Sequence, residues 1–264
     1  MKLGMSSAGF YGRMETEDEA SSLRQHFTLD VCEIFLQTRS EYARTFGETV
    51  KERLSGLPCV SVHPKGTQFE PDLFGGSPRQ RQDAMETLSH VLDAGQALGA
   101  SYYVFHGPSG VRSPMMPERI ASLPERFAAM QALAKAHHME ILWENVNWCT
   151  LRNLDCVRSA LGMIPDLHFV LDVKQAYLGK VDPFDMLHLM EGRVRHVHLL
   201  DWDENGKLCL PGEGVMDFPR LFRELKAQGY NGALILEPYA SQTTDTEAVK
   251  RSLAYLRETM ERFG

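Results

Sequence analysis

Three acidic residues each follow a short apolar run, and a histidine lies near the end of a fourth run. The acids are Glu144 after Ile141-Leu142-Trp143, Asp172 after Phe169-Val170-Leu171 and Glu237 after Leu234-Ile235-Leu236, and the histidine is His198. A charge at the end of a buried strand is costly unless it has a partner. A divalent cation shared by the four side chains would supply that partner, so we take a metal site as the leading hypothesis. The alternative is that each side chain is a separate structural hydrogen bonder.

The types of these side chains narrow the choice of metal. Three carboxylates and one imidazole form an oxygen-rich set that suits Mn²⁺, Mg²⁺ or Co²⁺, and Zn²⁺ also binds such sets. His63 and His106 end two further apolar runs and could hold a second metal or contact a substrate. If these two histidines bind metal, zinc becomes the favoured ion.

Eight strands alternate with eight helices along the chain, with no linker between them. The expected strands are Lys2–Ser6, Leu29–Leu36, Cys59–His63, Tyr102–His106, Glu140–Glu144, His168–Asp172, Val194–Leu200 and Ala233–Glu237. The expected helices are Thr16–Phe27, Ser40–Leu54, Arg79–Leu98, Pro117–His137, Leu151–Leu161, Pro183–Met190, Asp217–Gln228 and Thr246–Phe263. Apolar strands alternating with helices predict a parallel sheet covered by helices. At this length the pattern predicts an α/β protein with one (β/α)₈ TIM barrel, a single domain over residues 1–264.

Local signals predict where several of these helices begin and end. Thr16 and Glu19 have the spacing of a capping box, Ser40 is a candidate N-cap, and Asp217 is expected to cap the helix that follows it. Gly99 is expected to end the long helix Arg79–Leu98, with its own backbone in the left-handed conformation. The alternative to a closed barrel is an open doubly wound sheet. No Gly-x-Gly-x-x-Gly follows the first strand, which weakens the nucleotide-binding version of that alternative.

Composition limits the function classes. The chain has 264 residues, a net charge of −7 and 43% hydrophobic residues, which allows a full core and argues against a general nucleic-acid-binding surface. Its five scattered cysteines favour reduced thiols. The first residues do not read as a signal peptide and no apolar run is long enough to span a membrane. We therefore expect a cytoplasmic protein without membrane contact, which could form a homo-oligomer.

Several short motifs resemble those of the xylose isomerase-like barrel superfamily, which includes ketose 3-epimerases, hydroxypyruvate isomerase and endonuclease IV. The motifs are Trp143-Glu144-Asn145, Leu171-Asp172, His196-Val197-His198-Leu199, Pro211-Gly212-Glu213-Gly214 with Asp217-Phe218, Leu236-Glu237-Pro238 and, more loosely, Val62-His63-Pro64 and Phe105-His106-Gly107. The resemblance implies that Glu144, Asp172, His198 and Glu237 are metal ligands. It also implies that Glu144 and Glu237 act as the acid/base pair, transferring a proton through an enediolate.

Residues beside the ligand set are candidates for substrate binding. Members of the superfamily usually carry a histidine three residues after the strand-six aspartate, and here Gln175 stands there, preceded by Lys174. Gln175 could hydrogen-bond a substrate hydroxyl, and Lys174 could hold a phosphate or carboxylate or simply be solvated. Asn145 and Trp148 follow Glu144, and Trp148 could face a sugar ring or pack in its loop. Glu33 lies inside the second strand and could reach the barrel interior.

The resulting prediction is a divalent-metal-dependent sugar or sugar-phosphate isomerase or epimerase. One rival is a metal-dependent phosphodiesterase like endonuclease IV. Gln175 and the absence of Asp or His from the segment 206–210 weaken that rival, because they remove the ligands of a third metal. The other rival is a non-catalytic barrel that binds carbohydrate. The expected partner is a small sugar, and nucleic-acid binding is not expected.

Overall fold

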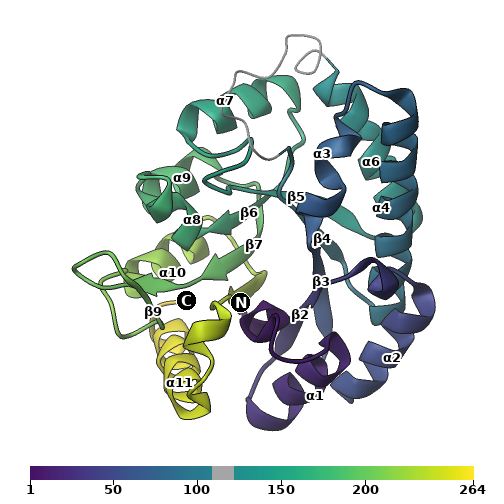
Figure 1. Cartoon of the computed structure of the whole chain (residues 1–264). Coiled ribbons are helices and arrows are strands. Elements are labelled where there is room, and N and C mark those ends of the chain that lie inside the picture. Colours follow the sequence, from purple (N-terminus) through teal and green to yellow (C-terminus); the bar gives the residue numbers. More distant parts are fainter. Residues whose placement is uncertain (109–121) are drawn as a thin grey trace.

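Eight parallel strands close into a barrel in the computed structural model, which describes residues 1–108 and 122–264 (Figure 1). The barrel strands, given in their order around the barrel, are β1 (Lys2–Ser6), β10 (Ala233–Leu236), β7 (Val194–Leu199), β6 (Phe169–Asp172), β5 (Glu140–Glu144), β4 (Tyr102–Phe105), β3 (Cys59–Pro64) and β2 (Val31–Leu36). Parallel pairing of β1 with both β10 and β2 closes the ring. The predicted (β/α)₈ fold is therefore confirmed.

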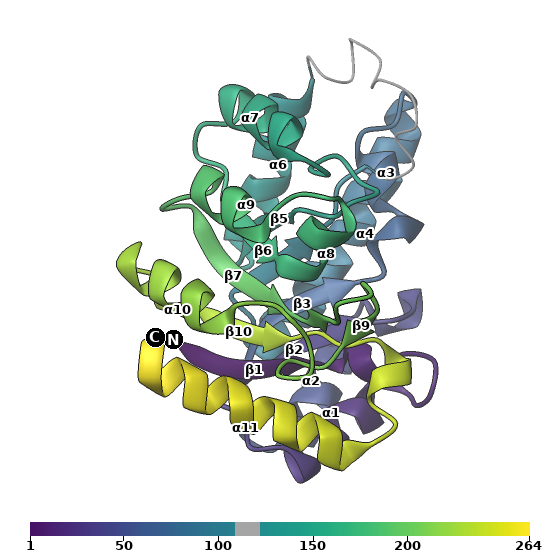
Figure 2. The same cartoon turned by 90° about the vertical axis from the view of Figure 1, so that its left-hand side faces the viewer.

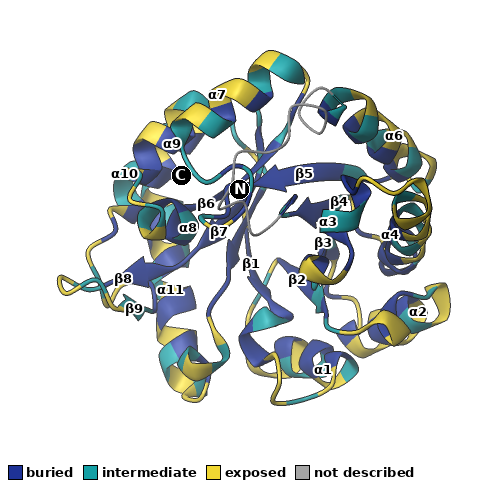
Figure 3. Ribbon diagram, turned by 45° about the horizontal axis from the view of Figure 1, so that its top comes forward, coloured by how far each residue is buried: buried dark blue, intermediate teal, exposed yellow. Residues whose placement is uncertain are grey.

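Helices surround the barrel and carry their exposed residues on their outer faces (Figure 3). They are α1 (Thr16–His26), α2 (Arg44–Leu54), α3 (Glu70–Leu73), α4 (Pro78–Leu98), α6 (Leu123–Ala136), α7 (Leu154–Met163), α8 (Val173–Leu178), α9 (Pro183–Leu189), α10 (Phe218–Ala227) and α11 (Thr246–Phe263). The main apolar core lies between these helices and the strands. A small antiparallel hairpin, β8 (Asp201–Trp202) with β9 (Leu208–Cys209), follows β7.

The barrel interior has its own apolar layers beneath the mouth. Val104, Leu142 and Val170 form one cluster, separate from the main core, and Val31, Ala233 and Ile235 form another. Gly4 fits this second cluster because a Cβ there would lie 2.6 Å from the end of the Ile235 side chain. Since side chains alternate along a strand, the residue two positions after an interior one also points inward. The interior layers therefore direct Glu144, Asp172 and Glu237 into the mouth.

Several helix boundaries differ from those expected from the sequence. Helix α2 begins at Arg44 with Ala43 as its N-cap, so the prediction of Ser40 as a cap is wrong. The reason is that the buried Glu41 carboxylate accepts hydrogen bonds from the Gln37 N–H and the Thr16 hydroxyl. Because the Thr16 hydroxyl bonds to Glu41, Thr16 does not form the predicted capping box with Glu19.

Other boundaries agree with the prediction. Gly99 ends α4 at a φ of 84°, and the Asp217 side chain accepts from the Arg220 N–H at the start of α10. The predicted helix 117–137 is seen as α6, and its first residues, 117–121, lie outside the described residues. All five cysteines are free thiols.

The two ends of the chain lie side by side at the end of the barrel opposite the site, as Figures 1 and 2 agree. The Met1 ammonium donates to Asn231, and the Lys226 ammonium donates to the Gly264 carbonyl. Within the described ranges, no helix combines the length and the apolar character needed to cross a bilayer.

Candidate metal centre

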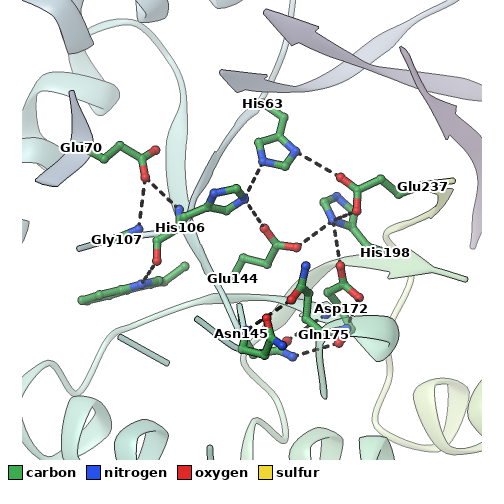
Figure 4. A network of polar contacts seen from close by, with 12 residues as sticks. His63, Glu70, His106, Gly107, Glu144, Asn145, Asp172, Gln175, His198 and Glu237 are labelled. Atoms are coloured by element: carbon green, nitrogen blue, oxygen red, sulfur yellow. Dashed lines mark hydrogen bonds and ion pairs between the residues drawn. The ribbon is translucent and has the colours of Figure 1, made fainter. Parts of the chain in front are cut away.

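Four side chains from four neighbouring strands converge at the barrel mouth (Figure 4). His198 Nδ1 lies 3.1 Å from Glu144 Oε1, 3.5 Å from Glu237 Oε2 and 4.0 Å from Asp172 Oδ2. One ligand atom from each of the four lies within 4.8 Å of the others. The structure therefore brings together the four residues that the sequence singled out.

The donor set fits a divalent cation. Glu144, Asp172 and Glu237 are 1%, 0% and 7% exposed, so three carboxylates share a site that water barely reaches. Among the described residues, Asp172 Oδ2 has no hydrogen-bond partner although the atom is buried, and Glu144 Oε2 lies 2.9 Å from His106 Nε2. Buried polar atoms normally have partners, and unpaired ones facing a shared point are what an ion-binding cage leaves behind.

Lys174 occupies the edge of this cage. Its ammonium donates to Glu237 Oε2 at 2.8 Å, lies 3.5 Å from Asp172 Oδ2 and stands over the Tyr239 ring at 4.8 Å. Lys174 is only 3% exposed, so the alternative of a solvated lysine does not hold. Burial alone would lower the pKa of Lys174, but Asp172 and Glu237 outweigh it and hold the pKa above its usual value.

The pKa values of the three carboxyl groups are shifted in different directions, although the groups share one site. Burial raises the pKa of Asp172 to about 7, with help from the charges of Glu144 and Glu237 and against the ammonium of Lys174. For Glu237, burial is outweighed by Lys174 and His198, which lower its pKa to about 2. Burial of Glu144 is likewise outweighed, chiefly by His198, so its pKa lies well below the usual range. The surroundings thus favour the ionised form of Glu144 and Glu237 and the protonated form of Asp172.

His63 and His106 stand beside Glu144 as the sequence predicted. Their Nε2 atoms are 2.7 Å apart, and His106 Nε2 is 2.9 Å from Glu144 Oε2. His63 Nδ1 faces Glu237 Oε1 at 3.3 Å on its other side. Burial lowers the pKa of His63, but Glu237 and Glu33 overcome this and raise it to about 10. His63, His106 and Glu144 form a second group of atoms close enough to hold an ion.

Glu33 lies beneath the ligand set, inside the barrel. Its Oε2 accepts hydrogen bonds from Ser61 Oγ at 2.8 Å and from the Nε2 atoms of His196 and His198 at 3.1 Å each. Burial would raise the pKa of Glu33, but His198, His196 and His63 together lower it well below its usual value. Together with His63, His198 and Glu237, Glu33 makes up a third group of mutually close ligand atoms.

The remaining residues predicted to bind substrate lie beside the candidate ligands. Asn145 is hydrogen-bonded through both ends of its amide to the backbone of Asp172, at 2.8 Å each, and so holds β5 and β6 together. Gln175 donates its N–H to Asp172 Oδ1 and accepts from Asn147. Trp148 is 44% exposed, and its ring meets His106 edge-on with 5.6 Å between centroids.

Two further buried acids shape the mouth, and sequence reasoning gave neither a role. Glu70 accepts from the Tyr103 hydroxyl and from the backbone N–H groups of His106 and Gly107, which fixes the end of β4. Asp201 accepts backbone N–H bonds from Trp202, Gly212, Gly214 and Met216. The signal for Asp201 was its place just past β7 and before a Pro-Gly-Glu-Gly turn.

Comparison with known proteins places this geometry in a family. The family model described as "Xylose isomerase-like TIM barrel" matches residues 23–259. The chain is 21% identical over 215 residues to fructoselysine 3-epimerase of Shigella flexneri, covering 78% of this chain and 75% of the relative. It is 26% identical over 123 residues to inosose dehydratase of Geobacillus kaustophilus, covering 36% and 40%.

Solved structures show the same fold. The structure of a D-tagatose 3-epimerase-like protein has a TM-score of 0.80 at 19% identity and covers 100% of this chain and 98% of that one. The IolI protein, whose structure holds a zinc atom, has a TM-score of 0.79 at 14% identity and covers 100% and 99%.

Proposed function

Because the chain belongs to the xylose isomerase-like TIM barrel family, we propose that it is a divalent-metal-dependent sugar epimerase or isomerase that moves a proton next to a carbonyl. The observation that carries this proposal is the convergence of Glu144, Asp172, His198 and Glu237 at the mouth. Epimerases among its relatives and the zinc atom of the IolI structure support it.

Two of the four side chains are suited to move the proton. A bound Mn²⁺, Mg²⁺, Co²⁺ or Zn²⁺ would act as a Lewis acid and stabilise the negative charge that develops on the substrate oxygens. Glu144 comes from β5 and Glu237 from β10, with β6 and β7 between them. The pKa of Glu144 is lowered chiefly by His198 and that of Glu237 by Lys174 and His198, so the carboxylate form of either could accept the proton from an α-carbon and leave an enediolate. For inversion, the other carboxyl group would carry a proton of its own and give it to the opposite face of the enediolate carbon, while the first keeps the proton it removed.

Neighbouring side chains would orient the sugar. The exposed Trp148 offers an apolar ring face at the mouth, and Gln175 lies beside Asp172. Lys174 already contacts Glu237, so its ammonium is placed to donate to a substrate oxygen held near that carboxylate. Asn145 supports the site through the Asp172 backbone.

Solvent-deuterium exchange tests the proposal directly. The metal-supplemented protein is incubated in D₂O with a panel of ketoses and ketose phosphates, and deuterium at the carbon beside the carbonyl is followed by NMR. We expect incorporation with the unmodified protein and none with Glu144→Gln or Glu237→Gln. The exposed Glu48→Gln variant is the matched control and should exchange normally.

The same experiment separates the rivals. Sugar binding without exchange in the unmodified protein would contradict the proposal in favour of a binding barrel. Turnover retained in Glu144→Gln or Glu237→Gln would remove that residue from the acid/base pair. Dehydration begins with the same proton removal, and the inosose dehydratase likeness makes it the second candidate. A product lighter by one water would identify it.

A further inference from the structure

Glu33 organises the histidine of the candidate metal centre from below. Its carboxylate is fully buried, and one oxygen, Oε2, accepts from Ser61, His196 and His198. Ser61 is also the strand neighbour of Glu33 in the β2–β3 register. Three bonds to one atom leave this oxygen little freedom.

The two nitrogens of His198 face in opposite directions as a result. Nε2 lies 3.1 Å from Glu33, and Nδ1 lies 3.1 Å from Glu144 on the side of the ligand carboxylates. An ionised carboxylate can only accept hydrogen bonds, so the bond to Glu33 requires a hydrogen on Nε2. With that hydrogen fixed, the lone pair that binds a cation must be on Nδ1.

We propose that Glu33 is a positioning residue that fixes the ring orientation and the Nδ1-binding form of His198 for a divalent cation. The inference rests on the proposed metal site. Carboxylates that accept from the far nitrogen of a metal-binding histidine orient the ring and raise its basicity as a ligand. The His198 ring lies between Glu33 Oε2 and Glu144 Oε1.

Glu33→Gln distinguishes this role from simple structural support. The amide keeps the shape of the side chain but is neutral, and it can present a donor as well as an acceptor to His198. Metal-free protein is titrated with Co²⁺ against a chelating competitor, and the visible spectrum of bound Co²⁺ is recorded. We expect the variant to bind Co²⁺ about 10–100-fold more weakly, with an altered spectrum. The melting temperature of its metal-free form should fall as well, because the Glu33 carboxylate accepts from Ser61, His196 and His198, so the altered Co²⁺ spectrum is the readout specific to positioning.

Glu19→Gln is the matched control, since Glu19 is a fully buried acid that has no contact with the site. It should leave Co²⁺ affinity and spectrum unchanged. Equal affinity in Glu33→Gln and the unmodified protein would overturn the inference, as would weaker binding with an unchanged Co²⁺ spectrum. If Glu33→Gln does not fold, Glu33→Asp, which withdraws the carboxylate from the ring, gives the same comparison. Failure of the unmodified protein to bind Co²⁺ would instead overturn the proposed function, and this inference with it.

Discussion

Replacing Lys174 with methionine should destabilise the metal-free protein far more than the metal-loaded protein. The ammonium lies 2.8 Å from Glu237 Oε2 and 3.5 Å from Asp172 Oδ2, and all three side chains are buried. At an effective dielectric constant of about 20, these attractions are about 6 and about 5 kcal/mol, before the cost of burying the charges. Removing one partner of a buried ion pair typically costs about 3–5 kcal/mol.

For a chain of this size, that cost corresponds to a fall in melting temperature of roughly 10 °C in the metal-free protein. A bound cation compensates Asp172 and Glu237 itself, so the metal-loaded variant should lose only about 1–2 kcal/mol, mainly packing. By linkage, the variant should also bind the cation more tightly, by roughly 30-fold for a difference of about 2 kcal/mol.

Calorimetry of both proteins with and without Mn²⁺, together with a competitive Mn²⁺ titration, measures these quantities. Lys135→Met, at an exposed position in the last turn of α6, is the control and should change neither value. Equal losses with and without the metal, or weaker metal binding by Lys174→Met, would refute the view that Lys174 and the cation compensate the same carboxylates.

Other predictions concern the metal, pH, the mouth and nucleic acid. Elemental analysis of metal-supplemented protein should find at least one stoichiometric divalent ion, and chelation should lower the melting temperature. Burial raises the pKa of Glu19 from 4.5 to about 8, so the folded protein retains a proton that the unfolded chain has lost. Stability should therefore fall as pH rises from about 4.5 to about 8, by up to ~1.4 kcal/mol per unit, and Glu19→Gln should flatten this slope in urea titrations. Asp201→Asn should cost roughly 2–4 kcal/mol and speed amide exchange either at Gly212 and Gly214 or at Trp202 and Met216, because each amide orientation leaves one of these pairs of N–H groups without an acceptor. Abasic DNA should not be cut at physiological salt with Zn²⁺ or Mn²⁺, and incision that depends on His63 and His106 would contradict the proposed function.

The convergence of the four candidate ligand residues could be predicted because short-range rules fix it. Glu144, Asp172 and Glu237 each end an apolar run, and parallel strands bring such ends to one face. The role of Glu33 could not be predicted in the same way. Its histidine partners lie 163 and 165 residues away, and only closure of the barrel brings β2 opposite β7.

Local signals failed where distant groups competed for the same atoms. Ser40 had the type and position of an N-cap, but the neighbouring Glu41 turns inward to Gln37 and to Thr16 of α1. Lys174 follows a strand end, where lysines are usually solvated, and its burial depends on Glu237 from a strand 63 residues away. Both outcomes depend on tertiary contacts that propensity and spacing do not contain.

Because the two ends of the chain lie close together, the same barrel could be formed by a chain that starts at a different strand. A Cβ added at Gly264 would meet the end of the Met1 side chain, so the ends are close enough for a short linker to join them. New ends could then open at Ser55–Gly56, an exposed turn with left-handed backbone between α2 and β3. Such circular permutants would begin at β3 yet deliver every strand end to the same mouth. The order in which the chain is synthesised could thus be varied while the side chains of the candidate metal centre stay in place.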